Sequence, residues 1–439
     1  MRILAAFLCA APLFAQQLSV EGLWVGSLEV GAVKLRLAFH LDGKGAGTFD
    51  SLDQGAKGIP LDSVKLEGTH VSITSRKVGG TYEAELLDGG KRLQGIWKQG
   101  TPLPLVLVRS ASLPEVKRPQ TPQPPFPYTS EEVSYPSVNP SVQLAATLTI
   151  PQGKGPFPAV VMITGSGAQD RDETLLGHKP FWVIADYLSR HGIAVLRADD
   201  RGTAKSTGSF AKSTSADFAD DAEGGVKFLA ARKEIGKIGL IGHSEGGMIA
   251  PMIANRNPRV GFVVLLAGTS VRGDELLLEQ NRLLMVNSGL IETTATLARV
   301  KKLYDIITSN ADPKVAAEKA TEAFPEPQAK SQIDTLNSPW FRWMLAYDPG
   351  TALQRLQQPA LVFNGTLDLQ VSAEQNLPVF AKKLAEAHNT DFKIMKMPGL
   401  NHLFQHCKTG SPKEYADIEE TFSPEVLQIM SEWINGHKE

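Results

Sequence analysis

Hydrophobic and polar residues alternate with a period of two over the first part of the chain, from Val20 to Arg109. Such alternation is typical of β-strands that have one buried and one solvated face. Turn pairs such as Asp42-Gly43 and Asp88-Gly89 lie where hairpins would close. We therefore expect a small all-β barrel or sandwich over residues 16–112, with about eight antiparallel strands at residues 22–28, 33–39, 47–52, 64–67, 71–74, 82–86, 93–97 and 103–108.

The pattern changes after a segment rich in proline. Six prolines fall within residues 114–127, and we interpret residues 113–130 as a stiff, extended linker. Beyond it, short apolar runs alternate with amphipathic stretches. Because strands that are apolar throughout are buried on both faces, residues 131–439 predict an α/β fold with a mostly parallel sheet covered by helices. An interruption at about residues 272–355 is helical in pattern and predicts a helical cap over the sheet edge. The predicted strands include residues 159–164, 193–198, 238–242, 260–266 and 360–364.

The N-terminus carries a different signal. Met1-Arg2 precedes an apolar run from Ile3 to Phe14, which predicts a secretory signal peptide over residues 1–15. About twelve apolar residues are too few to span a bilayer, and no later stretch reaches the ~18 that a span requires. We expect an extracytoplasmic protein, periplasmic or secreted, with no integral membrane segment in the mature chain; a buried N-terminal strand or helix is the alternative. Cys9 would leave with the signal, so Cys407 could form no intramolecular disulfide.

Composition narrows the classes of function. Lys and Arg number 45 and Asp and Glu 47, which gives a net charge of −2 and no excess of positive charge for a nucleic acid or an anionic membrane. A hydrophobic content of 42% with 21% charged residues is that of an ordinary globular chain rather than a disordered one. No clustered ligand set and no dinucleotide fingerprint is present, so we expect neither a metal nor an organic cofactor.

A serine flanked by glycines stands between a predicted strand and a predicted helix, in Gly242-His243-Ser244-Glu245-Gly246. This setting is that of a nucleophile elbow, in which a strained turn exposes the serine hydroxyl. A side chain at either flanking glycine would collide with the neighbouring strand or helix. We predict Ser244 as a nucleophile and expect His243 to point away from it. A plain glycine-rich turn is the alternative.

A serine hydroxyl needs a base to take its proton and a third group to hold that base. Asp368 follows a predicted strand, and His402 lies 34 residues further on, which leaves room for one helix and one strand. Both side chains would then emerge at the same sheet edge as Ser244, in the order Ser, Asp, His. Asp348 is the rival acid and His406 the rival base.

Acyl transfer also needs backbone N–H groups directed at the developing oxyanion. The amide of Glu245, directly after the predicted nucleophile, is one candidate. The second candidate is the amide of Ser166, with Gly167 close behind, in the loop Thr164-Gly165-Ser166-Gly167 that follows an earlier strand. A plain glycine turn is again the alternative.

These motifs together carry a resemblance to a known family. The stretch from about Glu131 onward resembles the α/β-hydrolases, and more narrowly the bacterial carboxylesterases grouped with serine-aminopeptidase-like hydrolases. The resemblance implies a triad of Ser244, Asp368 and His402 and hydrolysis of short-acyl esters. The family usually has His-Gly where this chain has Thr164-Gly165. The all-β segment resembles the lipocalin-like domains that precede hydrolase domains in some secreted enzymes. The matching segments are Gly165–Glu173, Asp200-Arg201-Gly202 and Gly242–Gly246.

Several other side chains have open roles. Residues 170–173 are all charged, and we interpret them as a surface ion-pair cluster, with substrate contact as the alternative. We expect Asp200 and Arg201 to tie the loop after their strand to its neighbours. Trp340, Phe341 and Trp343 could line a substrate pocket or form the core of the cap, and Gly167 could also touch substrate. Trp24 and Trp97 are expected in the barrel core rather than in a ligand pocket.

The sequence thus predicts a carboxylesterase-type serine hydrolase that acts on a small-molecule ester through an acyl-enzyme. A serine peptidase or acyl-peptide hydrolase could use the same three side chains. A binding protein, in which the barrel captures a ligand and the hydrolase fold is a retired scaffold, is the alternative from another class.

Overall fold

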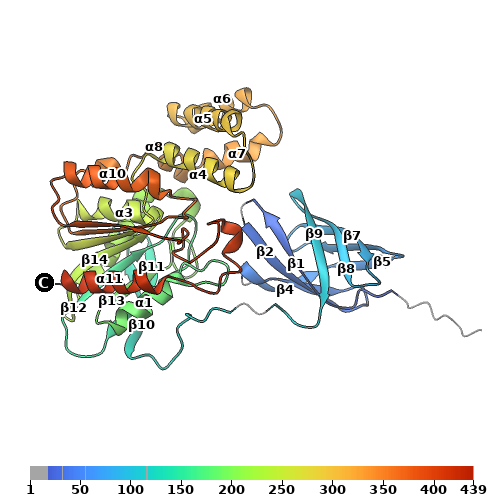
Figure 1. Ribbon diagram of the computed structural model, residues 1–439, viewed down its shortest axis with the longest axis horizontal. Helices are drawn as coiled ribbons and strands as arrows, with labels where there is room; N and C mark the ends of the chain where they lie inside the picture. The colour runs from blue at the N-terminus through green and yellow to red at the C-terminus, as the bar shows by residue number, and fades with distance from the viewer. Residues whose placement is uncertain (1–17, 32, 55, 115–116, 439) are drawn as a thin grey trace, which may run out of the picture. The chain divides into compact units, whose positions relative to one another are not determined.

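The computed structural model describes residues 18–31, 33–54, 56–114 and 117–438 (Figure 1). The chain divides at residues 115 and 116 into two compact units, and each is described by itself. The signal peptide predicted at residues 1–15 lies outside the described residues and stays a prediction.

The first unit is one antiparallel, nearly closed, barrel-like sheet, as predicted. Its strands lie in the order β4-β3-β2-β1-β9-β8-β7-β6-β5. Asp88 and Gly89 both have positive φ, at 54° and 64°, as a tight hairpin turn requires. Trp24 and Trp97 are buried in the hydrophobic core of this sheet. The strands are β1 Gly22–Val30, β2 Val33–Leu41, β3 Gly47–Ser51, β4 Ala56–Leu61, β5 Ser63–Glu67, β6 His70–Ser75, β7 Gly80–Leu87, β8 Arg92–Gln99 and β9 Thr101–Ser110.

The hydrophobic pattern did not predict one strand of this unit. β4 has the sequence Ala-Lys-Gly-Ile-Pro-Leu, which does not alternate and contains Pro60. Proline lacks the N–H that a central strand would use, and β4 lies at an edge, where it pairs with β3.

The second unit is built on a mixed sheet in the order β10-β11-β13-β12-β14-β15-β16-β17. The six strands from β12 to β17 run parallel, and β10 and β11 form an antiparallel edge. This confirms the predicted mostly parallel sheet. The strands are β10 Tyr128–Pro136, β11 Gln143–Pro151, β12 Phe157–Ile163, β13 Ala194–Ala198, β14 Ile235–His243, β15 Val260–Leu266, β16 Ala360–Gly365 and β17 Phe392–Met397.

The segment predicted as a linker does more than space two domains. β10 begins at Tyr128, inside the predicted range 113–130. The guanidinium of Arg118 donates to the carbonyls of Leu176, Ala416 and Ile418 at 2.8–2.9 Å. The proline-rich segment is therefore bound to the second unit through Arg118, near its start, in addition to its role as an extended linker.

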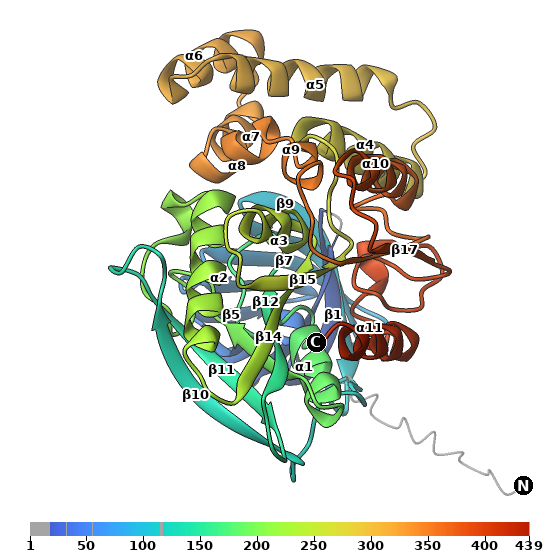
Figure 2. The same ribbon diagram turned by 90° about the vertical axis from the view of Figure 1, so that its left-hand side faces the viewer.

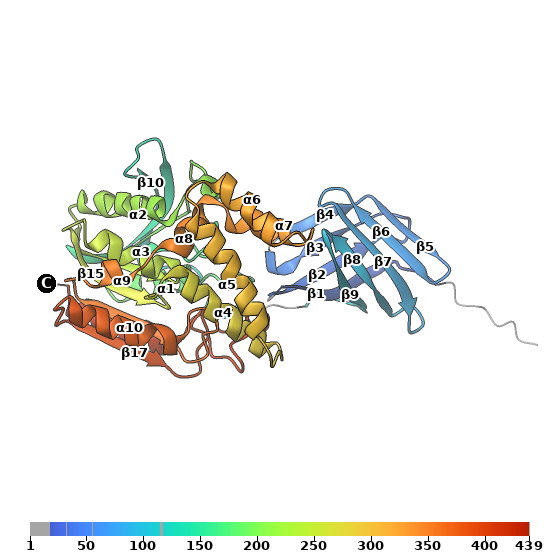
Figure 3. The ribbon, with the colours of Figure 1, turned by 90° about the horizontal axis from the view of Figure 1, so that it is seen from above.

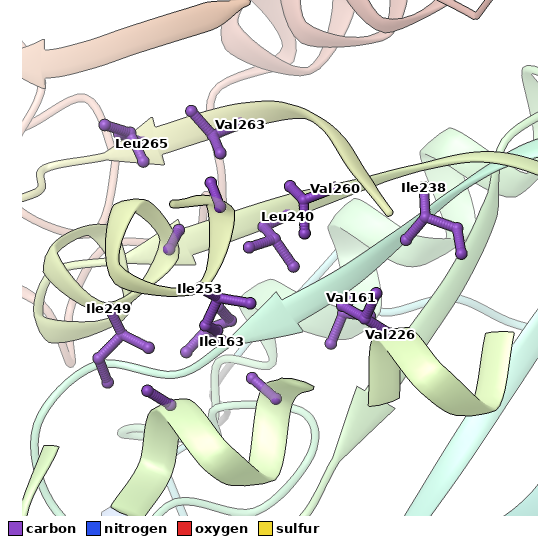
Figure 4. Packing of buried hydrophobic residues seen from close by; sticks show 14 of the residues in the cluster. Val161, Ile163, Val226, Ile238, Leu240, Ile249, Ile253, Val260, Val263 and Leu265 are labelled. Atoms are coloured by element: carbon purple, nitrogen blue, oxygen red, sulfur yellow. The ribbon is translucent and has the colours of Figure 1, made fainter. Parts of the chain in front are cut away.

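Helices cover both faces of the sheet in the second unit (Figure 2). The helices α2 Ser215–Ala230, α3 Glu245–Ala254 and α10 Ala373–Glu386 pack on one face. The helices α1 Pro180–Arg190 and α11 Pro424–Gly436 pack on the other. Figure 4 shows Val226 of α2 and Ile253 of α3 directed at the apolar side chains of β12 and β14. This burial on both faces explains the uninterrupted apolar runs of the strands.

The predicted helical cap is also confirmed, as an insertion between β15 and β16. It has a hydrophobic core of its own, which includes Leu303, Ile307 and Ile333. Figures 1 and 2 show α4 and α8 above α3, and Figure 3 shows the cap helices from above. None of the described helices is both long and apolar enough to cross a membrane. The cap helices are α4 Gly273–Asn287, α5 Thr294–Ser309, α6 Pro313–Ala323, α7 Ala329–Leu336, α8 Pro339–Ala346 and α9 Gly350–Leu353.

Candidate active site

Ser244 lies in the tight turn between β14 and α3, in a strained backbone conformation with φ 54° and ψ −113°. The flanking residues must be glycine for steric reasons. A Cβ built on Gly242 would lie 2.0 Å from the carbonyl oxygen of Gly246, and one on Gly246 would lie 2.1 Å from that of Ile163. The turn thus has the strand–turn–helix geometry that the sequence predicted.

Asp368 and His402 are brought together by the ends of two neighbouring strands. Asp368 follows β16, His402 follows β17, and His402 Nδ1 lies 2.8 Å from Asp368 Oδ2. Both side chains are buried. The other oxygen of Asp368 accepts the amides of Gln370 and Val371, each at 2.8 Å. These three contacts fix the plane of the Asp368 carboxylate, so the imidazole of His402 has a defined orientation.

The pair lies beside the turn of Ser244. The ring centroids of His243 and His402 are 4.9 Å apart, and His243 Nε2 lies 3.0 Å from the carbonyl oxygen of His402. Ser244, Asp368 and His402 therefore follow β14, β16 and β17, at the same edge of one sheet.

The two rival residues lie elsewhere. Asp348 Oδ1 accepts the amide of Gly350 at 2.8 Å, in the turn before α9. His406 is exposed and pairs with Glu420 at 2.8 Å. Asp348 is a turn residue and His406 half of a surface ion pair.

The glycine-rich loop after β12 lies against the serine. A Cβ built on Gly165 would lie 3.3 Å from Cβ of Ser244, so a larger residue would press on the nucleophile. Ser166 and Gly167, next in the chain, are exposed. Within the described ranges, the amides of Ser166 and Glu245 donate to no protein acceptor. The fold of the described residues therefore uses neither N–H group as a hydrogen-bond donor.

Asp200 holds the two ends of this loop. Its carboxyl accepts the hydroxyl of Thr164 at 2.7 Å and the amide of Gln169 at 2.8 Å. Burial raises the pKa of Asp200 to about 8. Arg201 pairs with Asp221 of α2 at 2.7 Å. Asp200 and Arg201 thus connect the loop after β13 to the loop after β12 and to α2, which confirms the predicted structural role of both residues.

The charged run at residues 170–173 is not the surface cluster that we expected. Arg171 is mostly buried and binds Asp199 with two nitrogens, at 3.0 and 2.8 Å. Asp172 pairs with the buried Arg197. Glu173 is itself buried. Charged residues in sequence suggest exposure, but here the partners come from β13 and the loop after it, which the local pattern does not reveal.

Glu173 and His243 form a buried contact that sequence reasoning missed. Glu173 Oε1 lies 2.9 Å from His243 Nδ1 and accepts the amide of Gly165 at 2.7 Å. Burial alone would lower the pKa of His243, but the charge and hydrogen bond of Glu173 outweigh it, and the pKa is raised. The available sequence signal was weak: Glu173 ends the charged run that follows the glycine-rich loop, and His243 directly precedes the nucleophile. His243 donates no hydrogen bond to Ser244, yet it is part of the site.

The side chain of Glu245 links the elbow to the cap. Its Oε1 accepts the indole N–H of Trp340 at 2.8 Å and the hydroxyl of Ser215 at 2.5 Å. Burial raises the pKa of the Glu245 carboxyl. Sequence reasoning considered only the amide of this residue. Trp340 is therefore a tether between α8 and the turn of Ser244.

The other aromatic residues of α8 divide between two clusters. Trp340 and Trp343 pack against an apolar cluster that contains Met248 and Val371, next to the elbow and to Asp368. Phe341 instead packs against the core of the cap. Trp340 and Trp343 thus lie at the boundary between cap and sheet, whereas Phe341 has the cap-core position that was the alternative.

The tether can be tested by Trp340→Phe. This change removes the N–H donor and leaves the buried Glu245 with one partner fewer, so the free energy of unfolding should fall by about 1–3 kcal/mol in a urea titration. Trp182→Phe is the matched control, because the ring of Trp182 faces Lys179 and the phenyl ring preserves that contact. The control should stay within about 0.5 kcal/mol of the parent. Equal losses in the two variants would contradict the tether.

Comparisons with known proteins give a family match and a curated relative. A family model described as X-Pro dipeptidyl-peptidase (S15 family) matches residues 141–402. The curated Esterase EstD of Thermotoga maritima is 32% identical over 278 residues, which cover 62% of this chain. The chain spans 61% of the length of that relative.

Similar solved structures include an esterase and a protein with bound ferulic acid. The Pyrococcus furiosus esterase Pf2001 has a TM-score of 0.46 and 14% identity, with 75% of this chain and 100% of that one covered. Est1E of Butyrivibrio proteoclasticus with bound ferulic acid has a TM-score of 0.44 and 15% identity, with 70% and 99% covered. The family match includes Ser244, Asp368 and His402 and extends over more than half of the chain. The chain belongs to the S15 family described as X-Pro dipeptidyl-peptidase.

Proposed function

We propose that this enzyme hydrolyses carboxylic esters through a Ser244–His402–Asp368 triad and an acyl-enzyme. Ser244 Oγ attacks the ester carbonyl while Nε2 of His402 takes its proton. The imidazolium then protonates the leaving alcohol, and a water molecule activated by the same histidine releases the acid. Asp368 keeps the Nδ1 proton of His402 in place and stabilises the imidazolium.

The observation that carries the proposal is the hydrogen bond of 2.8 Å between His402 and Asp368 next to a strained serine turn. Such strain persists only where the surrounding structure enforces it, and nucleophile elbows are one such case. The amides of Ser166 and Glu245 supply the oxyanion hole in this proposal, because Glu245 directly follows Ser244, Ser166 follows the Gly165 that approaches Ser244, and among the described residues neither amide donates to a protein acceptor. Two such donors stabilise the developing charge by a few kcal/mol.

A small ester with a short acyl group fits the surroundings. The cluster of Met248 and Val371 with Trp340 and Trp343 offers an apolar wall next to the triad, and Gly167 is exposed on the opposite loop. We propose Gly167, Trp340 and Trp343 as substrate contacts. EstD, the relative at 32% identity, is named as an esterase.

A peptidase is the second candidate, because the family model carries a dipeptidyl-peptidase description. An enzyme that removes residues from a peptide's N-terminus needs an acid to bind the substrate's ammonium group. Besides Asp368, the buried or partly buried acids described around the elbow and the loop after β12 include Glu173, Asp200 and Glu245, and each accepts hydrogen bonds from protein donors. This favours an uncharged substrate and hence the ester.

A substrate panel separates the two candidates. p-Nitrophenyl acetate and butyrate should be cleaved, and X-Pro and aminoacyl anilides should be cleaved at least a hundredfold more slowly. A fluorophosphonate should label the enzyme at Ser244, and Ser244→Ala should remove both the labelling and the esterase activity. Cleavage of the anilides alone would show that the enzyme is a peptidase and not an esterase. Absence of fluorophosphonate labelling would indicate a binding protein that has no catalytic serine.

A further inference from the structure

Three loops of the site meet at the buried contact of Glu173 with His243. Glu173 Oε1 accepts the amide of Gly165 at 2.7 Å, in the loop that carries the proposed oxyanion donor. His243 Nδ1 lies 2.9 Å from the same oxygen, directly before the nucleophile. His243 Nε2 lies 3.0 Å from the carbonyl oxygen of His402. One imidazole and one carboxylate thus join the loops of the oxyanion hole, the nucleophile and the base.

The chemistry of these partners determines how many protons the contact holds. A backbone carbonyl can only accept, so Nε2 of His243 must carry a proton toward His402. The oxygen of Glu173 already accepts from Gly165, so the short contact with Nδ1 requires a second proton between Nδ1 and Oε1. With both ring nitrogens protonated, His243 is an imidazolium and Glu173 a carboxylate. Loss of the second proton would leave two lone pairs facing each other at 2.9 Å.

We propose that Glu173 and His243 are positioning residues for the reaction proposed above, and that they hold the His402 loop and the oxyanion loop in register only while His243 is an imidazolium. Neither side chain touches substrate. The pair acts through the main chain of His402 and of Gly165, so its loss should lower kcat and leave KM nearly unchanged.

The dependence on pH follows from the charges around the ring. Glu173 and Asp368 face His243 and favour the imidazolium, and the second imidazole nearby is that of His402. Asp200 lies within electrostatic range of Glu173. The remaining wall is apolar and includes Phe181, Leu266 and Leu403. Because the pKa of His243 is raised above its ordinary value, the imidazolium persists to higher pH than in a free histidine and is lost as the pH rises through that pKa. Activity should therefore decline on the alkaline side.

The variant Glu173→Gln tests the proposal. The glutamine oxygen can still accept the amide of Gly165, but a neutral amide no longer stabilises the imidazolium, so the pKa of His243 falls. The alkaline limb of the kcat profile on p-nitrophenyl acetate should move down by about one pH unit or more, with KM unchanged within about twofold. A purely structural role would lower thermal stability and leave the shape of the profile as it was. An alkaline limb at its original pH would overturn the proposal.

The matched control is Glu420→Gln, which removes the acid from the exposed pair with His406. Like Glu173 and His243, this is a glutamate–histidine pair, and His406 lies only four residues after His402. Its loss should not shift the alkaline limb of the kcat profile. Should Glu173→Gln fail to fold, ¹⁵N spectra of the histidine rings in the wild-type protein decide the matter, with His243→Gln providing the assignment. Both ring nitrogens of His243 should be protonated at pH 7, and a neutral ring there would overturn the proposal. If the wild type hydrolyses no ester, the proposed function fails, whereas an active enzyme with a neutral His243 refutes only the positioning pair.

Discussion

Asp368→Asn should lower kcat for ester hydrolysis by about ten thousandfold while the fold stays intact. The oxygen of the new amide is needed by the N–H groups of Gln370 and Val371, which both donate to Oδ1 of Asp368. The amide NH₂ is then directed at Nδ1 of His402, which can only accept from it. This holds the proton of the imidazole on Nε2, the atom that must take the proton of Ser244. Steady-state kinetics with p-nitrophenyl acetate measure the loss.

The control for this variant is Asp391→Asn, because Asp391 also contacts a histidine, His437, at 3.3 Å on the surface. Its kcat should remain within about twofold of the wild type, and circular dichroism should show both variants folded. An Asp368→Asn enzyme with more than a tenth of the wild-type kcat would mean that another acid orients His402.

Gly246→Ala should both destabilise the second unit and lower its esterase activity. The added Cβ would lie 2.1 Å from the carbonyl oxygen of Ile163, which belongs to the backbone of β12 and cannot rotate away. Either α3 or β12 must shift, at a cost of about 3 kcal/mol in the free energy of unfolding. Because the shift moves Ser244 relative to His402, kcat/KM should fall by about a hundredfold or more. Urea unfolding and the esterase assay measure the two effects.

Gly436→Ala provides the comparison, since no atom lies within 4 Å of the Cβ that would be added there. Its stability and activity should match the wild type. A Gly246→Ala enzyme as stable as this control would show that the close approach of α3 to β12 is not needed for the turn.

The core elements of the fold and the three proposed catalytic side chains could be predicted from local pattern because each depends on local physics. The strands of the second unit are apolar throughout, since helices cover both faces, and this pattern can be read from the sequence alone. Asp368 and His402 each follow a parallel strand, so they had to emerge at the same edge as Ser244. The contact of 2.8 Å between them is the geometric result of that placement.

The parts that the sequence did not reveal depend on partners far along the chain. Glu173 and His243 are 70 residues apart, and the local pattern around each one does not show that they touch. Arg118 binds two carbonyls about 300 positions away, so the proline-rich segment predicted as a stiff, extended linker is also attached to the second unit. The edge strand β4 does not alternate, because an edge position with Pro60 tolerates an irregular pattern.

The cap is one uninterrupted insertion between β15 and β16, and these two strands pair directly with each other. Its core is separate from that of the sheet, and its tether to the elbow includes the hydrogen bond between Trp340 and Glu245. In evolution, this insertion could therefore be exchanged for one of different length while the proposed triad residues keep their positions on the sheet. The range of substrates could then change through replacement of the cap, provided that the new cap keeps an indole N–H that donates to Glu245.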